Sequence, residues 1–599
     1  MTSRVPDHWL ARAEGTPRNY DFAPSVPIPD SERVLDASGF WAHVRALAAS
    51  RGGDRPVVAL DTYPGVDLVG LEAATRSALP GWTVVDAERA ALPIDRIDAL
   101  IAPNLTDDRV FGRMSQFVLD EFYDELSLRQ VRTEVHDRPG PTVVLGWGAI
   151  LAAPDADVVV LVDLARWEAQ RRFRAGTPNW RCNNGAEDPL RKFKRGYFVE
   201  WRVADRHKAG FFDRLDLVLD TNRGIEDATA VTGAAFREAL ARAAHRPFRV
   251  VPYFDPGVWG GYWMETMLGL EPVAENYAWC FDCVPEENSL LLADGSGRQV
   301  EVPSLDLVLR QPRELLGERT FARFGAEFPI RFDFLDTMGG GNLSLQVHPL
   351  TDYIRRTFGM SYTQDESYYL LDCEDDAVVY LGLTEGVDPQ AMVDALVRAQ
   401  SGDEPFPAEQ FVNVVPVRKH DHVAIPAGTV HCSGTNSMVL EISATPYIFT
   451  FKLWDWDRVG LDGVPRPVHI EHGARNIQWD RDTQWVRENL VDRVQVVAEE
   501  PGHREERTGL HELEFIETRR HWFVRAIHLD TAGTVNVLNL VEGAAAVVAS
   551  PSGAFEPFEV HYAETFIVPA AVGPYDLTPA GGASRCGVVV ASVRGTATR

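Results

Sequence analysis

In the stretch Leu343-Ser-Leu-Gln-Val-His-Pro349, Gln346 and His348 stand two residues apart, so on a β-strand their side chains point to the same face. Glu366 follows, and His431 closes the stretch Ile425-Pro-Ala-Gly-Thr-Val-His. The four side chains offer two imidazoles, one carboxylate and one amide oxygen, which together suit a divalent metal. A metal held by barrel strands, with one position left for substrate, is a catalytic arrangement rather than a closed structural one. This part of the chain therefore predicts a β-barrel around a metal site.

The sequence beyond residue 248 has frequent turn signals and short β-type runs, which predict an all-β barrel with small helical additions. A charged, helix-like stretch over about 480–492 precedes a final β-rich segment, 513–596. We expect a metal-binding barrel over 248–490 and a second barrel over 491–599. The expected strands of the first barrel are 289–292, 344–347, 367–371, 377–381, 422–425 and 439–442, with one helix at 389–399.

The second barrel is expected because a short motif recurs. Ile425-Pro-Ala-Gly-Thr-Val-His431 is echoed by Val568-Pro-Ala-Ala-Val-Gly-Pro574. The position that holds His431 in the first copy holds Pro574 in the second. Proline has no side-chain donor atom, so the second barrel is predicted to hold no metal.

The amino-terminal part alternates apolar runs with helical patterns, which predicts an α/β domain with a parallel sheet over 46–245. Residues 1–45 are expected to form an irregular lead-in with a first helix near 36–50. The expected strands are 56–61, 82–85, 99–101, 142–145 and 158–162, and the expected helices are 68–77, 114–129 and 166–174.

The composition is that of a soluble globular protein of several domains, with 599 residues. A net charge of −28 argues against a nucleic-acid partner. Six cysteines do not form a disulfide framework, and reduced thiols in a cytoplasm are the simpler interpretation. No apolar run is long enough to span a membrane, and the first thirty residues lack the apolar core of a signal peptide. We therefore expect a cytoplasmic location and no membrane partner.

Five motifs in order resemble those of the class I mannose-6-phosphate isomerases, two-barrel enzymes of the cupin superfamily. They are Trp259-Gly-Gly261, the stretch that contains Gln346 and His348, Glu366 with the strand after it, the turn that ends at His431, and Asp455-Trp-Asp-Arg-Val-Gly-Leu-Asp-Gly463 with Val468-His-Ile470. The resemblance covers about 248–599.

This resemblance implies one Zn²⁺ per chain, held by four residues: Gln346, His348, Glu366 and His431. It implies a phosphorylated sugar as substrate, with mannose 6-phosphate and fructose 6-phosphate interconverted through an enediol. Such an isomerisation needs a proton-transfer group and a positive charge near the enediolate oxygens. Glu441 stands where the family has a proposed acid or base. Lys452 stands where the family has an arginine, and it keeps the charge without the planar fork.

The chain departs from the family at other places near the predicted site. Gln364 replaces a lysine two residues before Glu366, and Ser443-Ala-Thr-Pro-Tyr447 replaces a stretch of Gln, Asn and Ser. These changes leave a non-catalytic sugar-binding or regulatory protein as the alternative function. The oligomeric state is left open.

Other residues near these motifs are interpreted as structural. His420 and His422 lack the motif position. Cys280-Phe-Asp-Cys283 has no second cysteine pair, so two free thiols are preferred over a redox or second zinc site.

The α/β domain weakly resembles uridine-kinase-like folds at Val143-Val-Leu-Gly-Trp-Gly148, at 158–163 and at the arginine-rich 166–174. The loop Thr62-Tyr-Pro-Gly-Val has one glycine and no Gly-Lys-Ser/Thr, so it is not expected to cradle phosphates. From Arg166 to Lys208 there are twelve Lys or Arg against five Asp or Glu. This basic stretch is either an anion site for a phosphorylated sugar or nucleotide, or a solvated or docking face. A bifunctional isomerase with a nucleotide-binding domain is a third possibility.

Overall fold

The computed structural model describes residues 5, 7–14, 18–273, 275–444, 449–461, 463, 465–509 and 511–595. The chain divides into two compact units. The α/β unit comprises 25–243 and 285–311, and the β unit comprises 1–24, 244–284 and 312–599. Among the described residues, none of the helices has the length and apolar character needed to cross a membrane.

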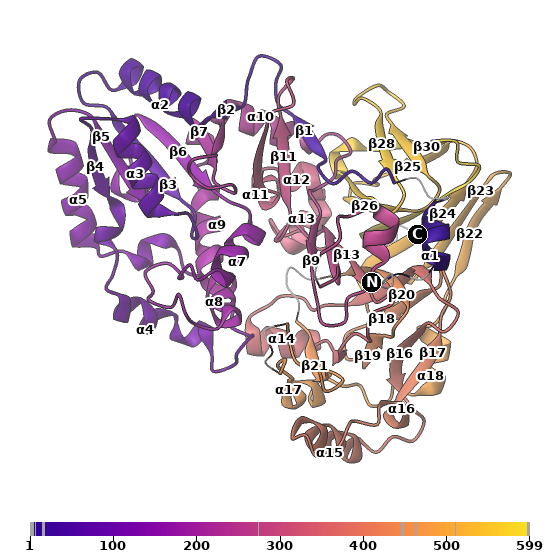
Figure 1. Cartoon of the computed structure of the whole chain (residues 1–599). Coiled ribbons are helices and arrows are strands. Elements are labelled where there is room, and N and C mark those ends of the chain that lie inside the picture. The colour runs from indigo at the N-terminus through magenta and orange to yellow at the C-terminus, as the bar shows by residue number, and fades with distance from the viewer. Residues whose placement is uncertain are drawn as a thin grey trace. The chain divides into compact units, whose positions relative to one another are not determined.

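The α/β unit is built on one seven-stranded sheet in which five adjacent strands, β7 to β4, are parallel, as predicted (Figure 1). Strands β3, β5 and β6 are buried along almost their whole length, which explains their continuous Val, Leu and Ala content. The strands in sheet order are β2 (Leu35–Asp36), β8 (Thr229–Thr232), β7 (Leu217–Asp220), β6 (Val158–Asp163), β3 (Val57–Thr62), β5 (Thr142–Gly146) and β4 (Thr83–Asp86). Strands β8 and β2 add an antiparallel edge.

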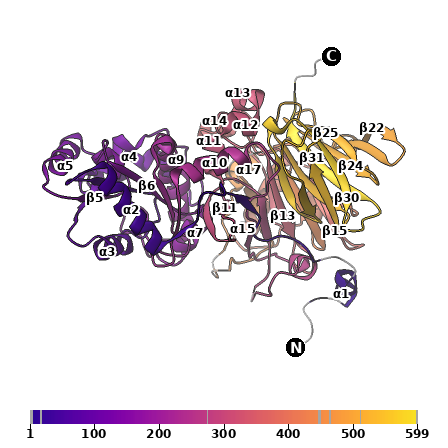
Figure 2. The same cartoon turned by 90° about the horizontal axis from the view of Figure 1, so that it is seen from above.

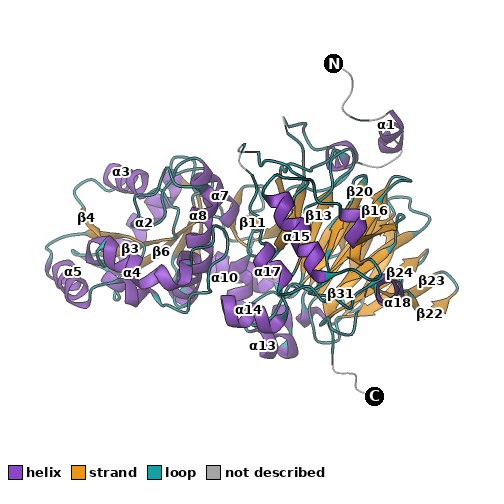
Figure 3. Ribbon diagram, turned by 90° about the horizontal axis from the view of Figure 1, so that it is seen from below, coloured by secondary structure: helices purple, strands orange, loops and turns teal. Residues whose placement is uncertain are grey.

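Helices cover both faces of this sheet (Figures 2 and 3). Helices α2 and α3 lie on one side, and α4 and α5 lie on the other. The helices of this unit are α2 (Ala37–Arg51), α3 (Leu68–Ala78), α4 (Ile94–Leu105), α5 (Glu125–Asp137), α6 (Ala149–Ala152), α7 (Arg166–Arg174), α8 (Pro189–Arg195), α9 (Trp201–Ala209), α10 (Gly233–Ala243) and α11 (Leu305–Arg310).

The α/β unit differs from the expected domain in two places. Residues 285–311, expected in the first barrel, form a hairpin of β11 (Ser289–Ala293) and β12 (Gln299–Pro303) that belongs to this unit. The described part of the expected lead-in contains two short strands, because β1 (Ser25–Pro27) pairs with β11 and β2 pairs with β8. Pairing between distant segments is the physical reason, and local sequence carries little trace of it.

The first barrel of the β unit consists of two sheets. One has the order β18 (His422–Ile425), β15 (Glu366–Cys373), β20 (Ser437–Ser443), β13 (Arg331–Asp336), β10 (Trp279–Cys283) and β9 (Tyr253–Asp255). The other has the order β17 (Val412–Pro416), β16 (Val378–Leu383), β19 (His431–Ser433), β14 (Leu345–Val347) and β21 (Phe451–Trp454).

The second barrel also has two sheets, and a core that includes Leu538, Phe566 and Tyr575 fills it. One sheet has the order β22 (Gln495–Glu500), β23 (His503–Thr508), β24 (Ile516–Phe523), β31 (Cys586–Val593), β26 (Asn536–Glu542) and β29 (Thr565–Val568). The other has the order β25 (Ile527–Asp530), β30 (Pro574–Ala580), β27 (Ala545–Ala549) and β28 (Phe558–His561).

The two barrels share one strand order. The run β18-β15-β20-β13 corresponds to β29-β26-β31-β24, and β17-β16-β19-β14 corresponds to β28-β27-β30-β25. Ile425 ends β18 and Val568 ends β29, while His431 begins β19 and Pro574 begins β30. The repeat inferred from the short sequence echo is therefore present in the topology.

The remaining helices of the β unit are short: α1 (Asp7–Glu14), α12 (Pro312–Leu316), α13 (Glu318–Phe324), α14 (Thr351–Phe358), α15 (Pro389–Gln400), α16 (Ala408–Phe411), α17 (Ile470–Ala474) and α18 (Thr483–Asn489). Helix α15 confirms the helix expected at 389–399. The helix-like stretch expected over 480–492 is reduced to α18, which Asp482 caps by accepting from the backbone N–H of Trp485.

Two expected elements of the α/β unit are wrong. Residues 99–101 lie inside α4, where Ile97 and Ile101 form a buried face four residues apart. A run of three apolar residues does not distinguish a strand from a helix face. The helix expected over 114–129 starts later, at Glu125, where Asp124 caps α5 by accepting from the backbone N–H of Ser127.

Candidate metal centre

Three neighbouring strands of the first barrel bring the predicted ligands to one face. Gln346 on β14 lies directly opposite His431 on β19 and opposite Lys452 on β21. Directly opposed residues of antiparallel strands project to the same side of the sheet, so all three side chains share one face. His348 follows β14 and continues the alternation to that face.

The other sheet supplies Glu366, which begins β15. Its two carboxylate oxygens lie 2.9 Å from His348 Nε2 and 2.9 Å from His431 Nε2. The Gln346 amide nitrogen lies 3.2 Å from His431 Nε2, and a half-turn of that amide presents its oxygen to the same point. All four residues are buried, and both histidines are fully inaccessible.

The ligand atoms of His348, Glu366 and His431 all lie within 4.8 Å of one another. Among the described residues, this is the only such group of three or more His, Cys, Asp or Glu side chains. The structure thus brings together the four residues that the sequence pattern selected.

Hydrogen bonds fix the orientation of both imidazoles. His431 Nδ1 lies 2.9 Å from the carbonyl oxygen of Thr429, and His348 Nδ1 lies 3.1 Å from the carbonyl oxygen of Phe449. When each Nδ1 donates its proton to this carbonyl, Nε2 is the ring atom that faces Glu366, and it can bind a metal once it carries no proton. This second layer of contacts is typical of metal-binding histidines, and the donor set fits a divalent cation such as zinc.

Charge is concentrated around Glu366. Burial would raise the pKa of its carboxyl, but His348 and His431, in their protonated form, hold that pKa well below its ordinary value. Gln364 Nε2 donates to Glu366 at 2.9 Å and lies 3.4 Å from an oxygen of Glu441. Gln364, one of the departures from the family pattern, thus bridges the two carboxyl groups.

Glu441 lies on β20, between Asp333 on β13 and Tyr368 on β15. Burial, and then the nearby charges of Glu366 and Asp333, raise the pKa of Glu441 well above its ordinary value. Glu441 therefore binds a proton more readily than an ordinary carboxyl does, close to the candidate metal ligands.

Sequence reasoning missed two charged residues of this interior. Arg331 and Asp333 lie two residues apart on β13, and their side chains form a buried ion pair of 3.3 Å. Burial raises the pKa of Asp333 to about 6, against the opposing effect of Arg331. The sequence signal that could have identified them is the alternation Arg331-Phe-Asp333, two charged residues that flank an apolar one in a strand-like run.

The turn that presents His431 is held rigidly. Gly428 has a φ of +88°, and a Cβ there would lie 2.9 Å from the carbonyl oxygen of Asn476. The buried guanidinium of Arg481 donates to the carbonyl oxygens of Pro426 and Ala427, each at 2.8 Å. Arg481 thus positions the turn, a role that the sequence pattern did not suggest.

The Trp259-Gly-Gly261 motif has a packing role. Trp259 is buried, and a Cβ on Gly261 would lie 2.3 Å from a carboxylate oxygen of Asp336. Only glycine permits this close approach.

The residues interpreted as structural lie outside the metal cluster. His422 lies between Thr508 Oγ1 at 2.8 Å and Ser367 Oγ at 3.0 Å, and burial lowers its pKa to about 3. His420 Nδ1 lies 2.8 Å from the hydroxyl of Tyr369. Cys280 and Cys283 are buried thiols on β10. Of the departure at 443–447, residues 445–447 lie outside the described residues.

Known proteins similar to this chain fall into two groups. Residues 39–245 match a family model described as a domain of unknown function (DUF8485). The chain is 27% identical over 229 residues to the protein named "Probable mannose-6-phosphate isomerase GmuF" of Bacillus subtilis, and 26% identical over 217 residues to the mannose-6-phosphate isomerase of Streptococcus mutans. These matches cover 38% and 36% of this chain, but only 66% and 62% of those relatives.

Two solved structures match 58% of this chain and 99% of their own. They are the mannose 6-phosphate isomerase of Bacillus subtilis, with a TM-score of 0.47 at 18% identity, and a phosphomannose isomerase variant from Salmonella typhimurium, with a TM-score of 0.44 at 14% identity. Over about 230 residues, the chain is thus similar in sequence to proteins named mannose-6-phosphate isomerases.

Proposed function

We propose that the β unit is a cupin-type, metal-dependent isomerase that interconverts an aldose phosphate and a ketose phosphate. Mannose 6-phosphate and fructose 6-phosphate are the proposed pair, and zinc is the proposed metal. The observation that carries the proposal is the convergence of Gln346, His348, Glu366 and His431 on one point, in a region similar to proteins named for this reaction.

The four residues would hold the metal, which would supply a Lewis acid for the sugar carbonyl or hydroxyl. The fixed Nδ1 protons of His348 and His431 keep both Nε2 lone pairs directed at the ligand position. Gln346 adds a neutral ligand, so Glu366 carries the only formal negative charge of the set.

Glu441 is the proposed acid or base. In an aldose-to-ketose conversion, a proton leaves C2, an enediol forms, and a proton returns to C1. The pKa of Glu441 is raised well above its ordinary value, so this carboxyl binds a proton more readily than an exposed one, which suits a group that accepts a proton from the sugar and returns it. Gln364, within 3.4 Å of Glu441, orients this carboxyl.

Lys452 is the proposed positive charge near the enediolate oxygens. It lies opposite Gln346 in the strand register and is half-buried, so its ammonium group shares the face of the metal ligands. Negative charge that develops on the substrate oxygens would be stabilised there.

A coupled assay of mannose 6-phosphate isomerisation, with and without a chelator, tests this function. We expect turnover that the chelator abolishes and added zinc restores. Sugar-phosphate binding without turnover would favour the alternative, a non-catalytic sugar-binding or regulatory protein, for which Gln364 in place of a lysine is the supporting observation.

For the α/β unit, we propose a kinase-like fold that lacks the phosphate-binding loop. The support is the central parallel strand β3, followed by a loop whose backbone is engaged internally. Tyr63 N–H donates to Val162 and Val66 N–H donates to Tyr63, while the Asp67 carboxylate accepts from Gly70 N–H at the start of α3. That carboxylate lies where a phosphate would bind. We also propose a cytoplasmic location for the protein.

A further inference from the structure

A cavity of about 700 Å³ lies in the α/β unit, at the carboxyl ends of its parallel strands. Its lining comes from the segments that follow five neighbouring strands: 63–69 after β3, Glu88 after β4, Trp147 after β5, α7 and 177–182 after β6, and 222–224 after β7. In open α/β sheets, ligands bind at this edge. The volume is that of a small-molecule site.

Four arginines line the cavity: Arg171, Arg172, Arg181 and Arg223. Part of the basic stretch from 166 to 208 is ion-paired inside the fold and does not line the cavity. Arg195 is paired with Asp98 and Glu200, and Lys208 with Asp163 and Asp306. Three arginines of that stretch therefore line the cavity, and Arg223, which lies outside the stretch, is the fourth.

Two of the four arginines have a structural task. Arg172 donates to the carbonyl oxygens of Gly65 and Thr221, which ties the loop after β3 to the loop after β7. Glu168 accepts a hydrogen bond from Arg172 Nε and from Arg171 Nε, each at 2.7 Å. The carboxylate of Glu168 is therefore paired with these two arginines of α7.

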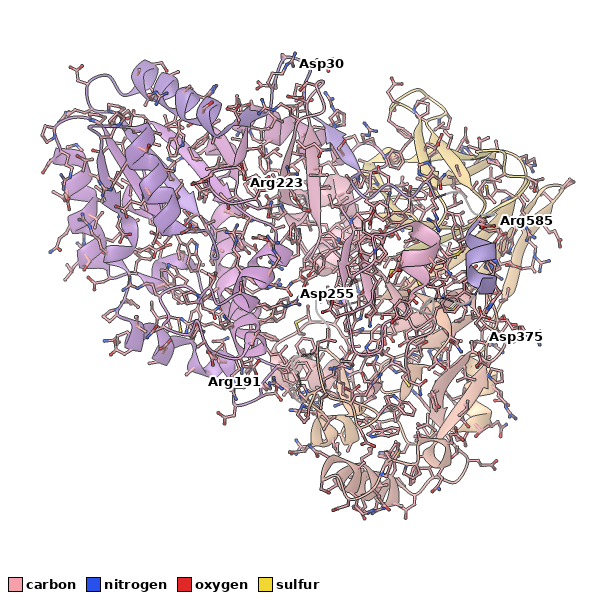
Figure 4. The ribbon with its side chains drawn as sticks, in the orientation of Figure 1. Asp30, Arg191, Arg223, Asp255, Asp375 and Arg585 are labelled. Carbon is pink, nitrogen blue, oxygen red and sulfur yellow. The ribbon has the colours of Figure 1, made fainter. Side chains whose placement is uncertain are left out.

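The other two arginines are available to a ligand. Arg223, labelled in Figure 4, is exposed and makes no hydrogen bond or ion pair with the described residues. Arg181 donates one Nη proton to the carbonyl oxygen of Glu88, while its buried Nε–H has no hydrogen-bond partner within the described part of the chain. An anion between them would meet two guanidinium groups, which bind phosphate oxygens with paired N–H donors.

A buried donor and a buried carboxyl line the same cavity as these arginines. Trp147 is 1% exposed, and its indole N–H has no hydrogen-bond partner among the residues described. Glu88 is 8% exposed and accepts from the backbone N–H of Trp147 at 3.1 Å. A neutral or charged carboxyl beside an indole N–H suits the hydroxyl groups of a sugar. A buried donor without a partner in the fold is able to donate a hydrogen bond to a molecule in the cavity.

We propose that this cavity binds the phosphate monoester of a sugar, with Arg181 and Arg223 on the phosphate and with Glu88 and Trp147 on sugar hydroxyls. The bound molecule is either a free sugar phosphate or a nucleoside monophosphate, since both offer the same groups. This site is separate from the candidate metal centre and does not depend on the proposed isomerase activity.

Cys182 gives a local readout, because it lines the cavity and is partly exposed. Cys373 of the β unit is also partly exposed and serves as an internal reference. The full chain is alkylated with iodoacetamide at rising concentrations of mannose 6-phosphate, adenosine monophosphate or inorganic phosphate. Peptide mass spectrometry then gives the alkylation rate at each cysteine. We expect at least one of the two esters to slow alkylation of Cys182 and to leave that of Cys373 unchanged.

Substitutions identify the groups responsible. Arg223→Ala removes an exposed side chain and is expected to leave folding intact, while raising the ester concentration for half-protection about tenfold. The double variant Arg181→Ala/Arg223→Ala is expected to abolish protection. The matched control is Arg76→Ala/Arg129→Ala, which removes two exposed arginines of the same unit and is expected to change nothing.

The ester that slows alkylation of Cys182 shows whether the cavity binds a free sugar phosphate or a nucleoside monophosphate. The proposal is overturned if neither ester protects Cys182, if protection survives the loss of both arginines, or if inorganic phosphate protects as well as the esters do. Because the readout is chemical protection at Cys182, a chain without isomerase activity leaves this test intact.

Discussion

Asn536 lies in the second barrel at the position that Glu366 occupies in the first. Glu366 pairs with Ile425 and Ser443, and Asn536 pairs with their counterparts, Val568 and Ser592. By the same register, Asp530, Ala532 and Pro574 correspond to Gln346, His348 and His431. The second barrel thus retains the fold but has Ala532 and Pro574 at the positions of the two metal-ligand histidines, so that it holds no metal at this place stays a prediction.

Replacing Glu366 or His431 by Ala is expected to remove most of the bound metal. Each change deletes one ligand of a buried set whose members face one another at 2.9 Å. Metal analysis of the purified variants measures the loss, with His136→Ala, an exposed histidine, as the control. Unchanged metal content in Glu366→Ala would refute the assignment.

Lys452→Ala is expected to lower kcat by roughly 100-fold or more, because the variant loses the charge proposed to stabilise the enediolate oxygens. Its metal content is expected to stay at the wild-type level. Lys452→Arg, which keeps the charge, should recover part of the lost rate. An alanine variant that turns over at the wild-type rate would exclude Lys452 from this role.

Arg481→Ala is expected to weaken metal binding about 10- to 100-fold, although Arg481 is not itself a ligand. Its guanidinium holds the carbonyl oxygens of Pro426 and Ala427 in the turn before His431. Competition with a chromogenic chelator gives the affinity, and the exposed Arg487→Ala is the matched control. Equal affinities in the two variants would contradict the positioning role.

The stability of the α/β unit is expected to fall as pH rises from about 4.5 to 7, in part because of Glu88. Burial raises the pKa of this carboxyl to about 7, above its value in the unfolded chain. The folded state therefore binds more protons than the unfolded state in that range, so the stabilising contribution is complete below pH 4.5 and lost above pH 7. This shift in the pKa of Glu88 corresponds to about 3 kcal/mol of unfolding free energy.

Glu88→Gln keeps a neutral, hydrogen-bonding group at this position and is expected to flatten that dependence. Chemical unfolding at several pH values, followed by a signal from the α/β unit, compares the two proteins. If wild type and variant lost stability in parallel across the range, the titration of Glu88 would not be the cause.

The sequence predicted local features well where one strong physical pattern decides them. The continuous apolar runs of β3 and β6 and the Pro-Ala-Gly-Thr turn before His431 were identified on composition and spacing alone. The metal ligands were selected by the resemblance of five ordered motifs to class I mannose-6-phosphate isomerases, and the ligand chemistry of the four residues agreed with it.

Features that depend on distant pairing were not predictable. The hairpin at 285–311 joins the α/β unit through the pairing of β1 with β11, which no local pattern encodes. Arg331 and Arg481 were missed because their roles depend on which carboxylate or carbonyl groups the fold brings to them. Ile97 and Ile101 were misassigned because a short apolar run fits both a strand and a helix face.

The most direct test of the account is anomalous X-ray scattering at the zinc edge from crystals of the full chain grown with zinc. We expect one strong anomalous-difference peak per chain, about 2.0–2.2 Å from His348 Nε2, His431 Nε2 and a Glu366 oxygen. We expect no peak beside Asp530 and Asn536 in the second barrel. A first barrel without a peak, or a peak bound by other side chains, would contradict the account.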